Sequence, residues 1–337
     1  QYIFFRSGVA TTDTGITLTC TNTVNAGVGR ITFSGYGNYS MKEAVTVGNA
    51  YFGASFNENG CVYLYSKENA IDTANIYGFD LSLRDENILR GTYMLFRWAA
   101  SWGATGHGMV KLNGHDQEFR IISSGEVPTE LFKGNDYACL FETASSRPCT
   151  ITVNGRGYKN SSGNTYVRMS GPISLVVEKV EPIESGWSLY QTFSKRRQDV
   201  TNIVLRSGWI QAKEGATFPK TESLTVSGGK LNFILATNSF TNLKVIRHTG
   251  GTIGHEGKTE TFLTPINCPK ARYYASTGAS LQIVDGVTNV VGRFYLDGEP
   301  MASGVYTKAE LPGLMSSSGA TGALEVRKGP GTALLLR

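Results

Sequence analysis

The chain has 337 residues, and its 32 basic and 27 acidic side chains leave a formal net charge of only +5. This charge is too small to predict a nucleic-acid partner, and no apolar run approaches the roughly 20 residues of a membrane-spanning helix. The 40 glycines, 10 prolines and 18% charged residues favour tight turns between strands over disorder. We therefore expect two folded domains or one elongated domain.

Short segments rich in β-branched and aromatic residues follow one another along the chain. In chain order they include GITLTC at 15–20, CVYLYS at 61–66, TYMLFRW at 92–98, CTITVNG at 149–155, ISLVVEK at 173–179, SLTVSGGKLNF at 223–233, LKVIRH at 243–248 and RFYLDG at 293–298. Each is bounded by Gly, Asn, Asp or Ser, and apolar and polar residues alternate within it, which predicts strands with one buried face. Helical periodicity is confined to one or two turns at 128–134 and 307–314.

The connections between these strands indicate how they pair. From Thr201 onward a short strand, a Gly-containing corner and a second strand recur without an Asn-Gly or Asp-Gly hairpin turn. In a coil of parallel strands each turn buries its inward residues against the next turn, and the corners need Gly, Asn or Ser. We predict an all-β, right-handed parallel β-helix with irregular terminal caps. Because no exact period is present, antiparallel β-sandwich domains remain the alternative.

Several segments resemble the bacterial autotransporter-associated β-strand repeat proteins. MVKLNGHDQEF (109–119) resembles a repeat strand of the form LDLNGxNQTV, and GPISLVVEK (171–179) and residues 191–219 are similar to further repeat strands. FYLDGEPMASGVYTKAELPGLMSSSGATGALEV (294–326) resembles the block that closes such chains in bacteria of the Verrucomicrobia type. The resemblance covers residues 109–337 and implies an exported β-helix with capped last turns, located outside the cell or on its surface. A chain that opens at Gln1 is typical of a processed or trimmed protein.

The predicted organisation has three parts. Residues 1–108 form a β-rich N-terminal region, either the first turns or a cap. Residues 109–290 form β-helix turns, and residues 291–337 form the C-terminal capping block. In that block, a short turn ended by Pro312 and Gly313 would cover the exposed edge of the last turn.

Aromatic and basic residues gather between positions 187 and 209. The set that we predict to bind a ligand is Trp187, Tyr190, Lys195, Arg196, Arg197 and Trp209. Rings stack on the apolar faces of sugars, and Arg pairs with carboxylate or sulfate groups, so a host or environmental glycan is the expected partner. The basic run stands where the resembled repeat has Gly and Thr. The alternative is that the cations form a solvated corner and the rings pack in the core.

The five cysteines form no CxxC pair and have no zinc-site spacing. Cys139 and Cys149 flank a short loop, and we expect them to form a disulfide in an exported protein, with Cys268 unpaired. The alternative is that all five are small buried side chains.

Residues suited to catalysis do not form a recognisable site. The four histidines have no ligand spacing, so no metal or cofactor is predicted. Asp116 and Glu118 would share one face of a strand, as paired carboxylates of a glycoside hydrolase could, but the repeat resemblance makes this stretch a structural turn. No catalytic residue is assigned.

Three functions from different classes remain open. The preferred one is a non-enzymatic exported or cell-surface β-helix scaffold, such as an adhesin or glycan-contacting protein. The second is a polysaccharide-active enzyme on the same fold, which would need Asp, or Arg and Lys, clustered on adjacent turns. The third is a structural surface subunit that forms a homo-oligomer through its strand edges.

Overall fold

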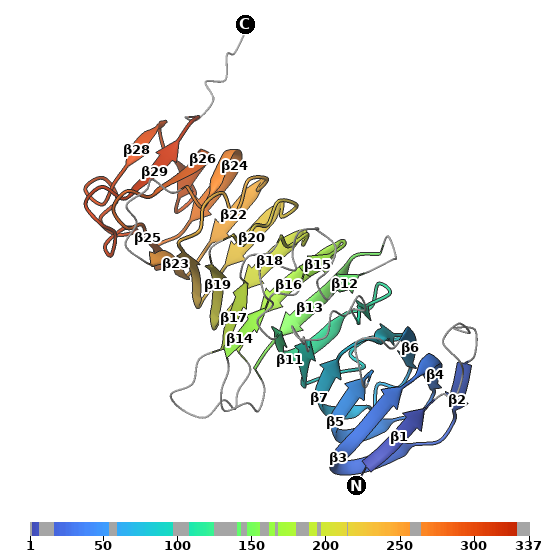
Figure 1. Cartoon of the computed structure of the whole chain (residues 1–337). Helices are drawn as coiled ribbons and strands as arrows, with labels where there is room; N and C mark the ends of the chain where they lie inside the picture. The colour runs from blue at the N-terminus through green and yellow to red at the C-terminus, as the bar shows by residue number, and fades with distance from the viewer. Residues whose placement is uncertain are drawn as a thin grey trace, which may run out of the picture. The chain divides into compact units, whose positions relative to one another are not determined.

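The computed structural model describes residues 2–6, 17–53, 59–96, 108–124, 140–142, 147–155, 162–165, 168–179, 189–193, 197–213, 215–256 and 264–328. Within these ranges the chain is all β, without a helix, and consecutive turns stack as a β-solenoid (Figure 1). The predicted parallel β-helix class is therefore confirmed. The chain divides into two compact units, residues 1–191 and 192–337.

Unit 1 has two ladders of parallel strands. The first contains β1 (Tyr2–Arg6), β3 (Val24–Ser34), β5 (Val45–Phe52), β7 (Ala70–Ile76), β9 (Thr92–Phe96), β11 (Gln117–Ser124), β13 (Cys149–Val153) and β16 (Ile173–Val177). The second contains β2 (Thr17–Cys20), β4 (Tyr36–Met41), β6 (Asn59–Leu64), β8 (Asp80–Leu83), β10 (Val110–Lys111), β12 (Leu140–Glu142) and β15 (Arg168–Ser170). A further strand of unit 1 is β14 (Ser162–Thr165), and β17 (Tyr190–Phe193) spans the boundary between the two units. Strands β2 to β9 already pair in parallel with their neighbours along the two ladders.

Unit 2 repeats this plan. Its long ladder contains β18 (Asn202–Leu205), β20 (Ser223–Val226), β22 (Val245–His248), β24 (Asn267–Ala275), β26 (Thr288–Leu296) and β29 (Ala323–Val326). Its short ladder contains β19 (Trp209–Lys213), β21 (Lys230–Ile234), β23 (Gly251–Glu256) and β25 (Ala279–Gln282). The small strands β27 (Glu299–Pro300) and β28 (Gly304–Tyr306) pair antiparallel with β26 and β29.

The core of unit 2 consists of columns of apolar side chains that repeat from turn to turn. Ile210, Leu231, Ile253 and Leu281 are successive register partners along the short ladder, and each is at most 1% exposed. Alternation along each strand directs every second side chain inward. Because the strands pair in register, each inward apolar side chain packs on an apolar side chain of the next turn. Each buried Leu or Ile contributes roughly 1.5–3 kcal/mol through removal of apolar surface from water.

Glycine is required at one recurring corner of unit 2. Gly208, Gly229 and Gly251 each precede or begin a strand of the short ladder with φ of 78°, 69° and 71°. A Cβ on Gly229 would lie 2.1 Å from the carbonyl oxygen of Gly208 in the preceding turn. Left-handed backbone and close inter-turn approach together exclude a side chain there.

The segment after β28 covers the edge of the short ladder. The backbone N–H of Leu281 in β25 donates to the carbonyl of Leu314, and the Ser318 hydroxyl accepts from Ile283 N–H at 3.0 Å. Within this segment the side chains of Leu311, Leu314 and Met315 are buried. The stretch 307–314 is a series of turns rather than a helix, with Glu310 accepting from the Thr307 backbone N–H. The edge of β25 is thereby paired rather than open.

Candidate functional site

Only part of the predicted ligand site can be placed. Trp187, Lys195 and Arg196 lie outside the described residues, and so does the side chain of Tyr190, whose backbone belongs to β17. Cys139 of the predicted disulfide is likewise outside, while Cys149 begins β13 and is buried. Cys268 carries a free thiol, whose Sγ lies 3.3 Å from the carbonyl oxygen of Phe240.

Arg197 has a partner within its own segment. Its Nε lies 2.7 Å from Oδ1 of Asp199, a carboxylate that is fully buried, whereas the Arg197 side chain is 54% exposed. Two residues apart in an extended segment, the two side chains share a face. A buried carboxylate needs such a partner, so this guanidinium has a structural role before any ligand is considered.

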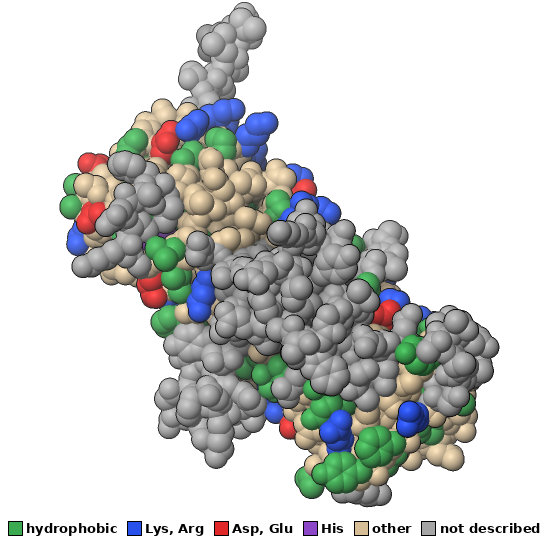
Figure 2. All heavy atoms as spheres, in the orientation of Figure 1, with side chains coloured by type: hydrophobic (Ala, Val, Ile, Leu, Met, Phe, Trp, Pro, Cys, Tyr) green, Lys and Arg blue, Asp and Glu red, His purple; other side chains and the backbone are tan. Residues whose placement is uncertain are grey.

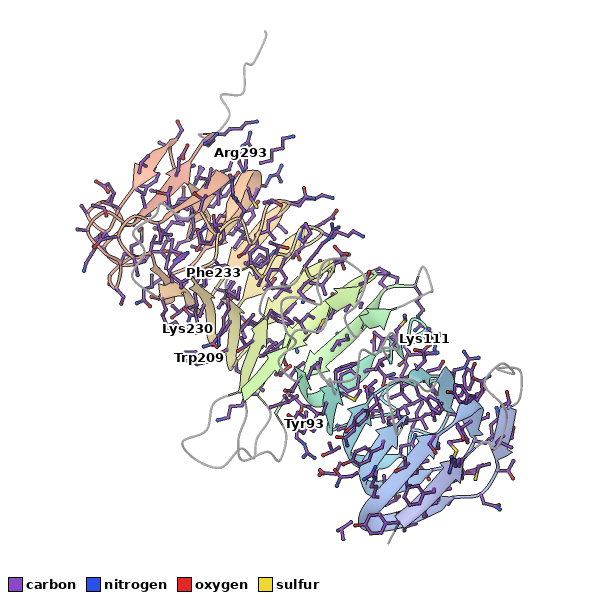
Figure 3. The ribbon with its side chains drawn as sticks, viewed as in Figure 1. Tyr93, Lys111, Trp209, Lys230, Phe233 and Arg293 are labelled. Carbon is purple, nitrogen blue, oxygen red and sulfur yellow. The ribbon has the colours of Figure 1, made fainter. Side chains whose placement is uncertain are left out.

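Trp209 lies in a cluster on the outer face of the short ladder (Figure 3). Its register partner on the next turn is Lys230, whose Nζ lies 5.0 Å from the centroid of the indole ring and 2.6 Å from Oε1 of Glu256. The hydrogen bond from Lys230 lowers the pKa of Glu256. The indole thus packs against a lysine that is held by an acid, an arrangement that stabilises the turn.

A different face of unit 2 gathers free cations. On the long ladder Arg272 of β24 is the register partner of Arg293 of β26, and Arg247 of β22 is the register partner of Tyr274 of β24. The intervening Ile246, Tyr273 and Phe294 are buried, so the alternate positions face outward. We call this surface the arginine face: Arg247, Lys270, Arg272, Tyr274, Arg293 and Tyr295.

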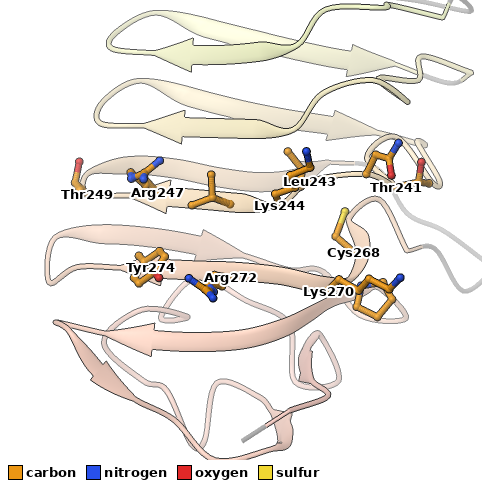
Figure 4. A pocket seen from close by; sticks show the side chains of 12 residues that line it. Thr241, Leu243, Lys244, Arg247, Thr249, Cys268, Lys270, Arg272 and Tyr274 are labelled. Atoms are coloured by element: carbon orange, nitrogen blue, oxygen red, sulfur yellow. The ribbon is translucent and has the colours of Figure 1, made fainter. Parts of the chain in front are cut away.

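The arginine face borders an open groove of about 990 Å³ along β22 and β24 (Figure 4). Arg247, Arg272 and Tyr274 lie toward one end of the groove, and Lys270 and Thr241 lie toward the other. Tyr274 and Tyr295 stack with ring centroids 4.7 Å apart and ring planes inclined by 14°. The groove therefore has a cationic floor with a pair of phenol rings beside it.

The charge of this face is uncompensated within the described part of the chain. Lys244 at its margin pairs with Glu222 at 2.7 Å, but Arg247, Lys270, Arg272 and Arg293 form no ion pair with any described residue. Blue side chains follow the margin of unit 2 that β22, β24 and β26 form (Figure 2). Cations this close repel one another, and an anionic ligand relieves the repulsion.

The sequence analysis did not identify the arginine face, although a weak signal exists. Arg-x-Tyr occurs at Arg272–Tyr274 and again at Arg293–Tyr295. A repeated pair of outward residue types in consecutive strands indicates columns on a common face if the strands are parallel and in register. On β22 the register partner of Arg272 is Val245, and Arg247 stands at the position of Tyr274, which weakens the pattern.

The described residues contain neither a metal cluster nor a membrane-spanning helix. No three His, Cys, Asp or Glu side chains converge there as metal ligands would, and no helix in the described ranges could span a membrane. Comparisons with known proteins found no matching family model, no matching curated protein and no matching solved structure.

Proposed function

We propose that the chain is a non-enzymatic, exported or cell-surface β-solenoid scaffold that contacts glycans through unit 2. The observation that carries this proposal is the arginine face, where outward Arg and Tyr side chains recur on adjacent turns. Sugars offer hydroxyl, carboxylate and sulfate groups, which guanidinium and phenol groups bind by directed hydrogen bonds.

The scaffold supports this role physically. Each turn is held to its neighbours by parallel ladder hydrogen bonds and by the buried columns, so outward side chains keep their spacing without a ligand. A preorganised surface loses less conformational entropy on binding than a mobile loop does. The resemblance to exported repeat proteins agrees with an extracellular ligand of this kind.

A glycan array tests the proposal. The array should include neutral, carboxylated and sulfated glycans, with mucin-type and plant polysaccharides among them. We expect binding to a subset of them by the wild-type chain. An array without a single reproducible hit would reject glycan binding.

A polysaccharide-active enzyme is the second candidate, and one observation favours it. An enzyme on this fold would need Arg and Lys clustered on adjacent turns, and Arg247, Lys270, Arg272 and Arg293 form such a cluster. Incubation with a panel of anionic polysaccharides, followed by reducing-end and unsaturated-product assays, separates the two. Release of product would establish the enzyme, and intact polymer would favour the scaffold.

A further inference from the structure

We infer that the ligand of the arginine face is a linear anionic polysaccharide that lies across the turns, along the long ladder, rather than along one strand. This inference rests on the proposed function and specifies its ligand class. It is carried by the positions of Arg247, Arg272 and Arg293, one on each of three consecutive strands, β22, β24 and β26.

The spacing of these cations suits a polymer with regular charges. Adjacent strands lie about 4.8 Å apart, so the register partners Arg272 and Arg293 recur at that interval, whereas Arg247, the partner of Tyr274, is offset by two residues along its strand. Sugar units in an extended polysaccharide advance by a comparable length, so a carboxylate or sulfate on every sugar, or on every second one, can meet a guanidinium on successive turns. A ligand along β24 alone would meet Lys270 and Arg272 but not Arg247 or Arg293 on the neighbouring strands.

The groups on this face are also available to a ligand. Arg247 and Arg272 are exposed and Arg293 is half-buried, and the guanidinium groups of these three form no hydrogen bond or ion pair with any residue that the structure describes. Guanidinium groups bind carboxylate and sulfate oxygens in a bidentate manner, which gives such contacts both strength and direction. The requirement for a negative partner is thus built into three consecutive turns.

The tyrosine pair favours a polysaccharide over single-stranded nucleic acid. Tyr274 and Tyr295 stack on each other, so their facing surfaces are covered and cannot receive a base between them. Single-strand nucleic-acid sites commonly present open aromatic faces on which successive bases stack. The phenol hydroxyls of these residues have no hydrogen-bond partner among the described residues, and hydroxyl-rich or charged sugars can bind them.

The test measures binding of the full chain to four immobilised polymers by biolayer interferometry at 50 to 200 mM salt. The polymers are heparin for sulfate, polygalacturonate for carboxylate, dextran as the neutral polysaccharide, and a single-stranded DNA of mixed sequence. The variants are Arg247→Ser, Arg272→Ser and Arg293→Ser, each made singly. Lys308→Ser, which removes an exposed cation outside the face, is the matched control.

We expect binding to heparin, polygalacturonate or both, and the comparison of these two arms identifies the anionic group. Each arginine variant should bind roughly fivefold more weakly, and its slope of log K against log salt should be less negative by about one. Lys308→Ser should keep the wild-type affinity and slope. Loss confined to Arg272→Ser would overturn the orientation across the turns. A variant that loses its circular dichroism signal is unfolded, and its binding is then not informative. In that case the slope of log K against log salt for the wild-type chain is the test, and a slope near zero would overturn the inference.

The other outcomes separate this inference from the proposed function. Binding to dextran or neutral array glycans alone would reject the anionic ligand while leaving glycan binding intact. Tighter binding to DNA than to both anionic polysaccharides would assign the face to nucleic acid. Absence of binding to any polymer or array glycan would reject both proposals together.

Discussion

The imidazole Nδ1 of His248 lies 2.8 Å from the hydroxyl oxygen of Tyr273, inside the core of unit 2. Its Nε2 lies 3.1 Å from the carbonyl oxygen of Gly251, which can only accept, so Nε2 carries the proton and Tyr273 donates to Nδ1. A second core histidine, His255, stacks on Phe233 with ring centroids 5.2 Å apart. Unit 2 therefore folds around two neutral imidazoles.

These histidines predict acid sensitivity. Burial lowers the pKa of both His248 and His255 from 6.5 to about 4. Because the unfolded state takes up protons first, stability is complete above pH 6.5 and falls as the pH drops from 6.5 to about 4. Each histidine should lower the free energy of unfolding by roughly 3 kcal/mol over this pH range. Urea unfolding followed by circular dichroism at several pH values measures the loss.

A variant assigns this loss to the core. His255→Phe keeps a ring against Phe233 and removes one titrating group, so the fall in unfolding free energy between pH 6.5 and 4 should shrink by about half. An unchanged pH profile in His255→Phe would contradict this assignment.

The corner glycines predict a steep cost for one added methyl group. Gly229→Ala places a Cβ 2.1 Å from the Gly208 carbonyl oxygen and requires an alanine at φ of 69°, so the turn must shift. We expect a loss of about 2–4 kcal/mol, from left-handed strain plus displacement. Gly286→Ala has a similar φ of 76° but open space around its Cβ, so it should cost only about 1 kcal/mol. Equal thermal midpoints for the two variants would argue against the close inter-turn approach.

We expect the hydroxyl of Ser318 to attach the C-terminal segment to the strand edge at residues 281–283. Its hydroxyl accepts from Ile283 N–H and donates to the Leu281 carbonyl at 2.9 Å. Ser318→Ala leaves both backbone groups without this partner and should lower stability by about 1–3 kcal/mol. The exposed neighbour Ser317 serves as the control, because Ser317→Ala should stay within about 0.5 kcal/mol of wild type. Hydrogen exchange at Ile283, if equally slow in both variants, would show that the bond contributes little.

We expect replacement of Arg197 to lower stability rather than to weaken ligand binding. Arg197→Met removes the ion pair between this guanidinium and the buried Asp199 carboxylate and should destabilise unit 2 by about 1–3 kcal/mol. Replacement of both residues, Arg197→Met with Asp199→Leu, should recover part of that loss, as a thermal double-mutant cycle would show. A polysaccharide-binding defect in Arg197→Met at full stability would instead restore the ligand role expected from the sequence.

The parallel β-helix could be predicted from the sequence because the patterns that indicate it lie within short segments. Alternation within segments such as 223–226 and glycine at corners such as Gly229 both lie within a few residues, and together they indicate parallel coiling. The Arg197–Asp199 pair was accessible in the same way, since residues two apart share a face. Alternation and a left-handed corner glycine can be recognised within a few residues, although the close approach of Gly229 to Gly208 is a contact between turns.

The arginine face was not accessible because it depends on register between turns. Arg272 and Arg293 become register partners, and Arg247 comes to lie beside Tyr274 on the same face, only through the lengths of the intervening connections, and these lengths differ. Between β24 and β26 the pairing also shifts register between Cys268 and Arg272. A shift of one residue moves a side chain to the opposite face of a strand, so sequence alone could not place these arginines together.

Arginine-selective footprinting with phenylglyoxal, read by mass spectrometry with and without saturating heparin, tests the central claim most directly. The account predicts that Arg247, Arg272 and Arg293 all become modified several-fold more slowly with the polymer bound. Arg90, which pairs with Glu118 in unit 1, should react at the same rate in both samples. Equal modification of the three face arginines with and without polymer, or protection of Arg90 instead, would contradict the account.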